Sequence, residues 1–118
     1  MLKIVLIDDD PISTFITEKL ISKYLHEPFQ IYKFEKAADA LKRIYNISPN
    51  YLFLDLNMPE MNGWEFLEQF SPRKTSPEIY ILSSSLDQRD INRANDYSQV
   101  KQYLSKPMIN KYISHIFN

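Results

Sequence analysis

The sequence predicts an α/β fold built on one doubly wound, five-stranded parallel sheet. Short apolar segments alternate with helix-like segments about five times along the chain. This alternation is typical of βαβ units, in which helices cover both faces of a parallel sheet. Three of the apolar segments are hydrophobic almost throughout and two are interrupted by polar residues. The contrast predicts three central strands and two edge strands.

The strands are expected in five segments, which are 3–8, 29–34, 51–56, 78–83 and 100–105. Segments 3–8, 51–56 and 78–83 are short apolar runs, as expected for strands that are covered on both faces. Segments 29–34 and 100–105 contain Lys and Gln and are therefore expected at the edges. The strand order 2-1-3-4-5 places these two segments outermost.

Helices are expected between and after the strands, in segments 11–25, 36–46, 63–70, 86–96 and 109–117. Several of these segments have apolar residues at the spacing of an amphipathic helix. In segment 11–25 these residues are Ile12, Phe15, Ile16, Leu20 and Tyr24. Segment 86–96 is polar, with Leu86, Ile91 and Ala94 as its main apolar anchors, which predicts a weakly attached helix.

Composition limits the class of protein. A chain of 118 residues fits one domain, 1–118, and the absence of cysteine excludes disulfides and thiolate chemistry. A net charge of −1 argues against direct nucleic-acid binding, which needs a clustered basic face. No apolar run is long enough to span a membrane, and no signal-peptide pattern precedes the first strand. We therefore expect a soluble, cytoplasmic protein that does not enter a membrane.

Polar residues follow four of the expected strands. Asp8 and Asp9 close the first strand, and Asp55 closes the third. The fourth ends in Ser83-Ser84-Ser85, and the fifth runs into Ser105-Lys106-Pro107. In doubly wound sheets, sites form beyond the carboxyl ends of the strands where the strand order reverses, which here lies between strands 1 and 3. We therefore expect carboxylates, a hydroxyl and an ammonium group to converge there.

These residue types suit phosphoryl transfer. Three carboxylates, Asp8, Asp9 and Asp55, are oxygen ligands of the kind that Mg²⁺ prefers. A carboxylate can also act as a nucleophile and form an aspartyl phosphate. Lys106 and the Ser83 hydroxyl could neutralise phosphoryl oxygens that the metal does not cover. The set therefore favours phosphorylation of Asp55.

Four segments, "VLIDDDP", "YLFLDLNMPEMNGWEFL", "ILSSS" and "YLSKP", resemble the receiver domain of two-component response regulators. The resemblance spans nearly the whole chain and implies a flavodoxin-like (βα)5 fold. It implies that Asp55 accepts a phosphoryl group from a histidine kinase or a histidine phosphotransfer protein. It also implies that Mg²⁺ is held by Asp8, Asp9, Asp55 and the backbone carbonyl of Asn57.

The resemblance further implies that Ser83 is the switch hydroxyl, Tyr103 the switch aromatic and Lys106 the phosphate partner, with a cis Lys106–Pro107 bond. Ser84 and Ser85 are alternatives for the switch hydroxyl. The chain is expected to be a stand-alone receiver domain without an output domain, although a receiver excised from a larger protein is the alternative. It would act by binding an unknown downstream protein through the face formed by its fourth helix, fifth strand and fifth helix.

The sequence departs from the family pattern in two places. Ser83 replaces the commoner threonine, which preserves the hydroxyl, and residues 95–99 replace the usual Gly-Ala pair before the last strand.

Asp10 is expected to have a different role from its neighbours Asp8 and Asp9. It precedes Pro11 and is interpreted as the N-cap of the first helix, with a direct or water-mediated role at the metal as the alternative.

Three other functions are alternatives to the signalling switch. A Mg²⁺-dependent phosphohydrolase with an aspartyl-phosphate intermediate would need a second Asp two residues after the nucleophile, where this chain has Asn57. A flavodoxin-like cofactor binder would need a phosphate loop after the first strand, where three carboxylates stand instead. An unphosphorylated docking module on the same fold is the third alternative. The favoured interpretation is a signalling switch that is not a conventional enzyme.

Overall fold

The computed structural model describes residues 1–117, and Asn118 lies outside the described part. Ten elements alternate along the described chain. The strands are β1 (Leu2–Ile7), β2 (Phe29–Phe34), β3 (Tyr51–Leu54), β4 (Glu78–Ser83) and β5 (Val100–Ser105). The helices are α1 (Pro11–Tyr24), α2 (Ala37–Ile47), α3 (Gly63–Gln69), α4 (Gln88–Ala94) and α5 (Asn110–Phe117).

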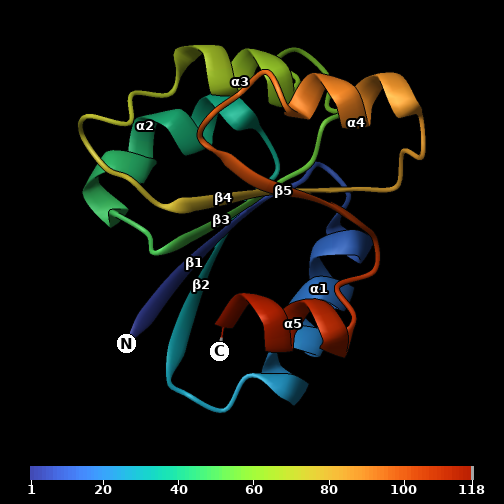
Figure 1. The fold of residues 1–118 in the computed structure, drawn as a ribbon. Helices are drawn as coiled ribbons and strands as arrows, with labels where there is room; N and C mark the ends of the chain where they lie inside the picture. The colour runs from blue at the N-terminus through green and yellow to red at the C-terminus, as the bar shows by residue number, and fades with distance from the viewer. Residues whose placement is uncertain (118) are drawn as a thin grey trace.

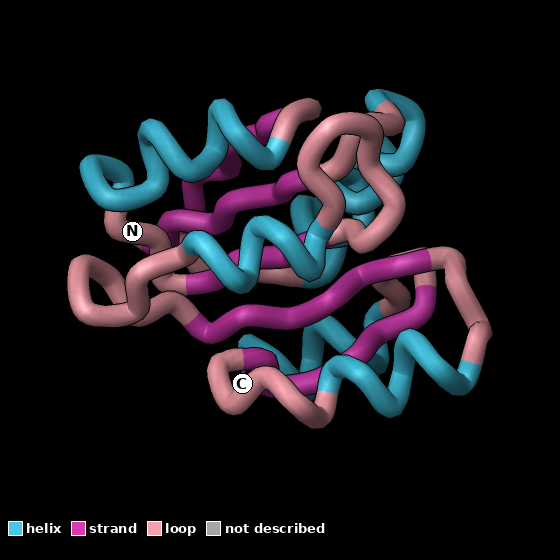
Figure 2. The backbone as a smooth tube through the Cα atoms, turned by 90° about the horizontal axis from the view of Figure 1, so that it is seen from above, coloured by secondary structure: helices cyan, strands magenta, loops and turns pink. Residues whose placement is uncertain are grey.

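The five strands lie side by side in one sheet (Figure 2). They are all parallel and follow the order β2-β1-β3-β4-β5, which confirms the predicted topology. The apolar strands β1, β3 and β4 occupy the centre because both of their faces are covered. Ile4 of β1, which is fully buried, pairs with Ile31 of β2 and with Tyr51 of β3. The order reverses between β1 and β3, where the sequence predicts the site.

Helices cover both faces of the sheet, so the core has two halves. Helices α2, α3 and α4 lie on one face, and α1 and α5 lie on the other (Figure 1). Ile44, Leu54 and Phe66 represent the first half of the core, and Ile21 and Ile113 belong to the second. The sheet is therefore the middle layer of three, and its ends are left open to form a site.

Several predicted boundaries shift by one or two residues. The first and third strands end at Ile7 and Leu54, so Asp8 and Asp55 are the first residues beyond them. The fourth helix is shorter than segment 86–96 because the side chain of Asp87 accepts a hydrogen bond from the backbone N–H of Arg89 and caps it. Asp8 and Asp55 are thus not part of the strands, but the strands that end just before them still fix their positions at the edge of the sheet.

The anchoring of α4 differs from the expectation. Leu86 is 78% exposed and anchors nothing, whereas Ala94 is buried as predicted. The guanidinium of Arg93 lies 4.8 Å from the ring of Trp64, and Trp64 stacks on Tyr97 with 5.4 Å between ring centroids. Arg93 at the end of α4 and Tyr97 just beyond it therefore both contact Trp64 of α3, through a cation–π contact and an aromatic stack.

The orientation of α1 also corrects the sequence pattern. Its predicted apolar stripe faces outward at its first turns, where Ile12 is 69%, Phe15 58% and Ile16 44% exposed. The buried residues of α1 are instead Thr14, Thr17 and Ile21. The Asp10 carboxylate accepts the N–H of Ile12 at 3.0 Å, which confirms that Asp10 is the N-cap. Capping fixes where α1 starts, and the short threonines let it pack closely beside the rim.

Candidate functional site

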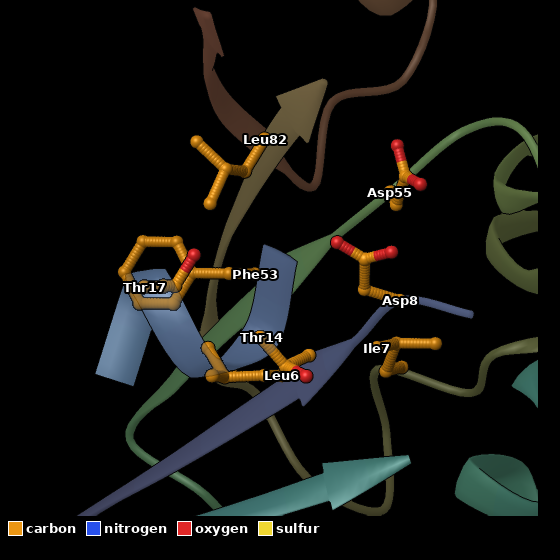
Figure 3. Close-up of a pocket in the computed structure, with 8 residues that line it drawn as sticks. All are labelled: Leu6, Ile7, Asp8, Thr14, Thr17, Phe53, Asp55 and Leu82. Atoms are coloured by element: carbon orange, nitrogen blue, oxygen red, sulfur yellow. The ribbon is translucent and has the colours of Figure 1, made fainter. Parts of the chain in front are cut away.

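Three carboxylates meet at the carboxyl ends of β1 and β3. Asp8 and Asp55 are buried, Asp9 is exposed, and one carboxylate oxygen from each lies within 4.8 Å of the others. Asp8 and Asp55 lie beside each other at the ends of neighbouring strands (Figure 3). The structure therefore brings together the three acidic residues that the sequence selected.

The backbone holds these carboxylates in place. The N–H of Asp8 donates to the carbonyl of Phe34 at 3.0 Å, and the N–H of Asp55 donates to the carbonyl of Ile7 at 2.9 Å. One oxygen of the Asp55 carboxylate, Oδ1, accepts the N–H of Leu56 at 2.9 Å. The hydrogen bonds extend the sheet by one residue on each strand and leave Oδ2 of Asp55 without a backbone partner among the bonds described.

Lys106 supplies the positive charge at the site. Its ammonium lies 2.8 Å from Oδ2 of Asp8 and 3.6 Å from Oδ2 of Asp55. The backbone N–H of Lys106 donates to the backbone carbonyl of Ser83, and this hydrogen bond connects the β5–α5 loop to β4. The Lys106–Pro107 peptide bond is cis, as the resemblance implies. The ammonium is therefore placed between two buried carboxylates.

Burial raises the pKa of Asp55 from its ordinary 3.8 to about 6. The negative charge of Asp8 also raises the pKa, while the Lys106 ammonium and the N–H of Leu56 lower it. One ammonium therefore does not fully compensate the cost of ionising Asp55 beside Asp8. Three carboxylates and one ammonium leave an excess of negative charge among oxygen donors, which fits a hard divalent cation such as Mg²⁺.

The predicted hydroxyl and aromatic groups lie on the adjoining strands. Ser83 ends β4, is fully buried, and accepts the N–H of Ser85 on its hydroxyl at 3.1 Å. Tyr103, which is half-buried on β5, donates its hydroxyl to the carbonyl of Ser85 at 2.9 Å. Asn57 lies in the exposed loop two residues beyond Asp55. The roles of these three residues stay predictions. The hydroxyls of Ser83 and Tyr103 both form a hydrogen bond with the backbone of Ser85.

Sequence reasoning missed two threonines of α1. Thr14 and Thr17 line a small pocket together with Asp8 and Asp55 (Figure 3). The hydroxyl of Thr14 donates to the carbonyl of Pro11 at 3.1 Å. The signal in the sequence was two threonines three residues apart just after the helix cap, which share one helix face. Apolar residues on the opposite face concealed this signal.

Gly63, the first residue of α3, packs against the backbone behind Asp55. A Cβ atom on Gly63 would lie 2.6 Å from the Asp55 carbonyl oxygen and 3.0 Å from the Cα of Leu56. Both of these contacts are with backbone atoms, which cannot rotate away. The only glycine of the sequence is therefore required by close approach, and it fixes the loop that carries Asp55.

We expect Gly63→Ala to destabilise the fold by about 1–3 kcal/mol, the usual cost of overpacking. The loop after β3 or the start of α3 must shift to admit the methyl group. Urea denaturation measures the change. Gln69→Ala, at an exposed position of the same helix, is the control and should change stability by less than about 0.5 kcal/mol. Equal stability of the two variants would contradict the assigned contact.

Comparisons with known proteins identify the class. A family model described as the response regulator receiver domain matches residues 4–117. An uncharacterized response regulatory protein of Vibrio cholerae is 34% identical over 111 residues, which are 92% of this chain. The chain spans 44% of the length of that relative. The chain therefore belongs to the family of response regulator receiver domains, which are typically phosphoacceptors in two-component signalling rather than conventional enzymes.

Solved structures agree with this assignment. A two-component response regulator from Cytophaga hutchinsonii superimposes with a TM-score of 0.86 at 30% identity, covering 98% of this chain and 93% of that chain. The Mn²⁺-bound form of response regulator Rcp1 superimposes with a TM-score of 0.76 at 20% identity, covering 98% of this chain and 88% of that one. The second likeness shows the shared fold. Among the described helices, none is both long and apolar enough to cross a membrane.

Proposed function

We propose that this chain is a phosphorylation switch in which Asp55 accepts a phosphoryl group from a histidine kinase or a histidine phosphotransfer protein. The observation that carries the proposal is the grouping of Asp8, Asp9 and Asp55 within 4.8 Å, with the Lys106 ammonium 3.6 Å from Asp55. Mg²⁺ is the proposed cofactor, held by these three carboxylates and by the backbone carbonyl of Asn57. The response regulator Rcp1, which has the same fold and is known in a Mn²⁺-bound form, is consistent with a divalent cation as the cofactor.

The proposed reaction uses one oxygen of Asp55. Oδ1 is held by the N–H of Leu56, and Oδ2 attacks the phosphorus atom. A new O–P bond forms while the bond from phosphorus to the donor breaks, and the donor keeps the electron pair of that bond. At pH 7, above the pKa of about 6, Asp55 is mostly the nucleophilic carboxylate. A bound Mg²⁺ would offset the negative charge of the carboxylates and of the phosphoryl oxygens.

Lys106 and Ser83 are proposed to bind the transferred group. The Lys106 ammonium already lies between Asp8 and Asp55, so it can pair with a phosphoryl oxygen carried by Asp55. The Ser83 oxygen accepts an N–H, which leaves its proton available for donation. Binding of the phosphoryl group by Ser83 would pull on the β4–α4 loop. This loop contacts Tyr103, so the proposed output is a shift of the face formed by α4, β5 and α5.

The proposal is tested by incubating the chain with acetyl phosphate and Mg²⁺. We expect the intact mass to rise by one phosphoryl group, and we expect the label to be lost in hydroxylamine, which cleaves acyl phosphates. EDTA should prevent labelling. Continuous release of p-nitrophenol from p-nitrophenyl phosphate would instead support the phosphohydrolase. A chain that takes no label would support the docking module and contradict the switch.

The exposed start of α1 is the proposed docking surface for the phosphodonor protein. Ile12 and Ile16 line a groove with Lys106 and Pro107, and Phe15 lies on the same exposed turns. A donor that brings phosphohistidine to Asp55 must cover this rim. Large apolar side chains that are left exposed beside a reaction site mark an interaction surface.

We expect Phe15→Asp to slow phosphotransfer from a phosphorylated histidine phosphotransfer protein that labels the wild-type chain by at least about tenfold, because hot-spot aromatics contribute about 2 kcal/mol or more. Labelling by acetyl phosphate should stay unchanged, since this small donor needs no docking surface. Ser22→Asp adds the same charge at an exposed position farther along α1 and is the control. An equal loss with both donors would show damage to the site and would contradict the docking role.

A further inference from the structure

The loop between β4 and α4 is organised around one serine. The N–H of Ser85 donates to the Ser83 hydroxyl at 3.1 Å, and its carbonyl accepts the hydroxyl of Tyr103 at 2.9 Å. The Ser85 hydroxyl donates to Oδ2 of Asp90 at 2.8 Å and accepts the N–H of Asp87 at 3.2 Å. Four hydrogen bonds therefore converge on Ser85, and a carboxylate of α4 forms the shortest of them.

Asp90 has few other tasks in the described structure. It lies in the first turn of α4, one turn after the cap Asp87, and it is half-buried. Its backbone N–H donates to the carbonyl of Asp87 at 3.0 Å, so the backbone of the turn forms without the side chain. The side chain points back to Ser85 rather than outward to solvent, as the 2.8 Å bond requires. The Asp90 carboxylate thus joins α4 to the loop that follows Ser83.

The contact between Asp90 and Ser85 matters for the orientation of the hydroxyl at position 83, because that residue is a serine and not a threonine. A threonine has a stiff χ1 angle because two heavy atoms branch from its Cβ, whereas a serine lacks that restraint. The orientation of the Ser83 side chain is therefore held by a neighbouring residue, through the N–H that Ser85 donates to its hydroxyl oxygen. That N–H keeps its position only if Ser85 does. Preorganised donors stabilise developing charge because no reorganisation is needed during the reaction.

We propose that Asp90 is a positioning residue for the phosphorylation of Asp55. It acts through Ser85: it holds the Ser85 N–H against the oxygen of Ser83, so that the Ser83 proton is directed to the phosphoryl group. This inference rests on the proposed function of Asp55. It adds a residue of α4 to the reaction, on the helix whose face is the proposed output. The bond that prepares Ser83 also connects it to that helix.

The first test is the rate constant for labelling by acetyl phosphate and Mg²⁺, followed by intact mass. We expect Asp90→Ala to slow labelling by about threefold to tenfold, the range that one ordinary hydrogen bond contributes. Asp90→Asn should restore the wild-type rate, because its amide oxygen accepts the same hydrogen bond although the charge is gone. Asp96→Ala, which removes an exposed acid just beyond α4, should leave the rate unchanged.

The second test separates positioning from a structural role. In a Ser83→Ala background, Asp90→Ala should slow labelling no further, because the residue through which it acts is absent. An equal slowing in both backgrounds would show a general effect on α4 and would overturn the proposal. Ser85→Ala removes the same hydroxyl contact from the other side and should slow labelling as much as Asp90→Ala does. This variant keeps the proposal testable if Asp90→Ala does not fold.

The outcomes distinguish the positioning role from the function on which it rests. If the wild-type chain is labelled and Asp90→Ala is labelled equally fast, the positioning role fails and the phosphoacceptor stands. If Asp90→Asn is as slow as Asp90→Ala, the charge at the helix start matters rather than the hydrogen bond, and the positioning role fails again. If the wild-type chain takes no label, both proposals fail together.

Discussion

Asp55→Asn is expected to abolish Mg²⁺-dependent labelling by acetyl phosphate. The substitution keeps the shape of the side chain and the oxygen that accepts the N–H of Leu56. An amide is neither charged nor a competent nucleophile toward phosphorus, so the loss should be complete rather than partial. Intact mass spectrometry over the time in which the wild-type chain is fully labelled measures it.

Asp39→Asn is the control for this variant. Asp39 is exposed in the first turn of α2, which follows the edge strand β2 rather than β1 or β3, and it undergoes the same change of functional group. Its labelling should equal that of the wild-type chain. An Asp55→Asn variant that still takes up label, and holds it in acid, would assign the phosphoryl group to another side chain.

The second large effect is on stability. The pKa of Asp55 rises from 3.8 to about 6 on folding, chiefly through burial, with the charge of Asp8 adding to the rise. A raised pKa means that the folded chain binds the Asp55 proton more tightly than the unfolded chain does. This contribution is fully present below about pH 4 and is lost as the pH rises through about 6. The ionised carboxylate therefore destabilises the fold at neutral pH.

Asp55→Asn removes this penalty. In EDTA at about pH 7.5 we expect the variant to be more stable than the wild-type chain by up to about 3 kcal/mol, the free energy that corresponds to the shift. At about pH 4 the advantage should disappear, because the wild-type carboxyl is then protonated as well. Urea denaturation at both pH values measures the difference. A stability gap that is independent of pH would show that the cause is not the ionisation of Asp55.

Mg²⁺ gives a matched control for the same argument. A ligand that binds only the folded state stabilises it by mass action. Mg²⁺ should therefore stabilise the wild-type chain at neutral pH and narrow its gap to Asp55→Asn. If Mg²⁺ stabilised the two chains equally, the bound ion would not need the Asp55 carboxylate.

Strand order was predictable from hydropathy together with the common order of doubly wound sheets. A strand covered on both faces needs apolar residues on both sides, so β1, β3 and β4 could be placed at the centre from their composition. Placing Asp8, Asp9 and Asp55 together then required only that parallel strands end at one edge. The position of the acidic residues at the rim follows from topology, which is why they could be predicted from the sequence.

The face of α1 was not predictable in this way. Helical periodicity gave Ile12, Phe15 and Ile16 a common stripe, and periodicity cannot tell whether a stripe faces a core or a partner. Thr14 and Thr17 pack beside the rim, where short side chains fit and where Thr14 returns its hydroxyl to the helix backbone. An apolar stripe that faces solvent instead of the core of its own protein is typical of an interaction surface.

The hydrogen bonds around Ser85 were also not predictable from the sequence. Ser83, Ser84 and Ser85 are chemically alike, and the sequence favoured Ser83 as the switch hydroxyl with Ser84 and Ser85 as alternatives. The structure shows how their surroundings differ, because Ser83 is fully buried and Ser84 is exposed. Ser85 contacts Ser83, Asp90 and Tyr103 at once. Such hydrogen bonds depend on loop geometry, which no periodic pattern encodes.

The central claim is that Asp55 carries the phosphoryl group, and locating the label on the wild-type chain tests it most directly. The labelled chain is reduced with sodium borohydride, which converts an acyl phosphate to an alcohol, and is then digested and sequenced by mass spectrometry. The account predicts that the reduced residue is Asp55, and that it appears only when both acetyl phosphate and Mg²⁺ were present. Reduction at Asp8 or Asp9 with Asp55 intact would contradict the account.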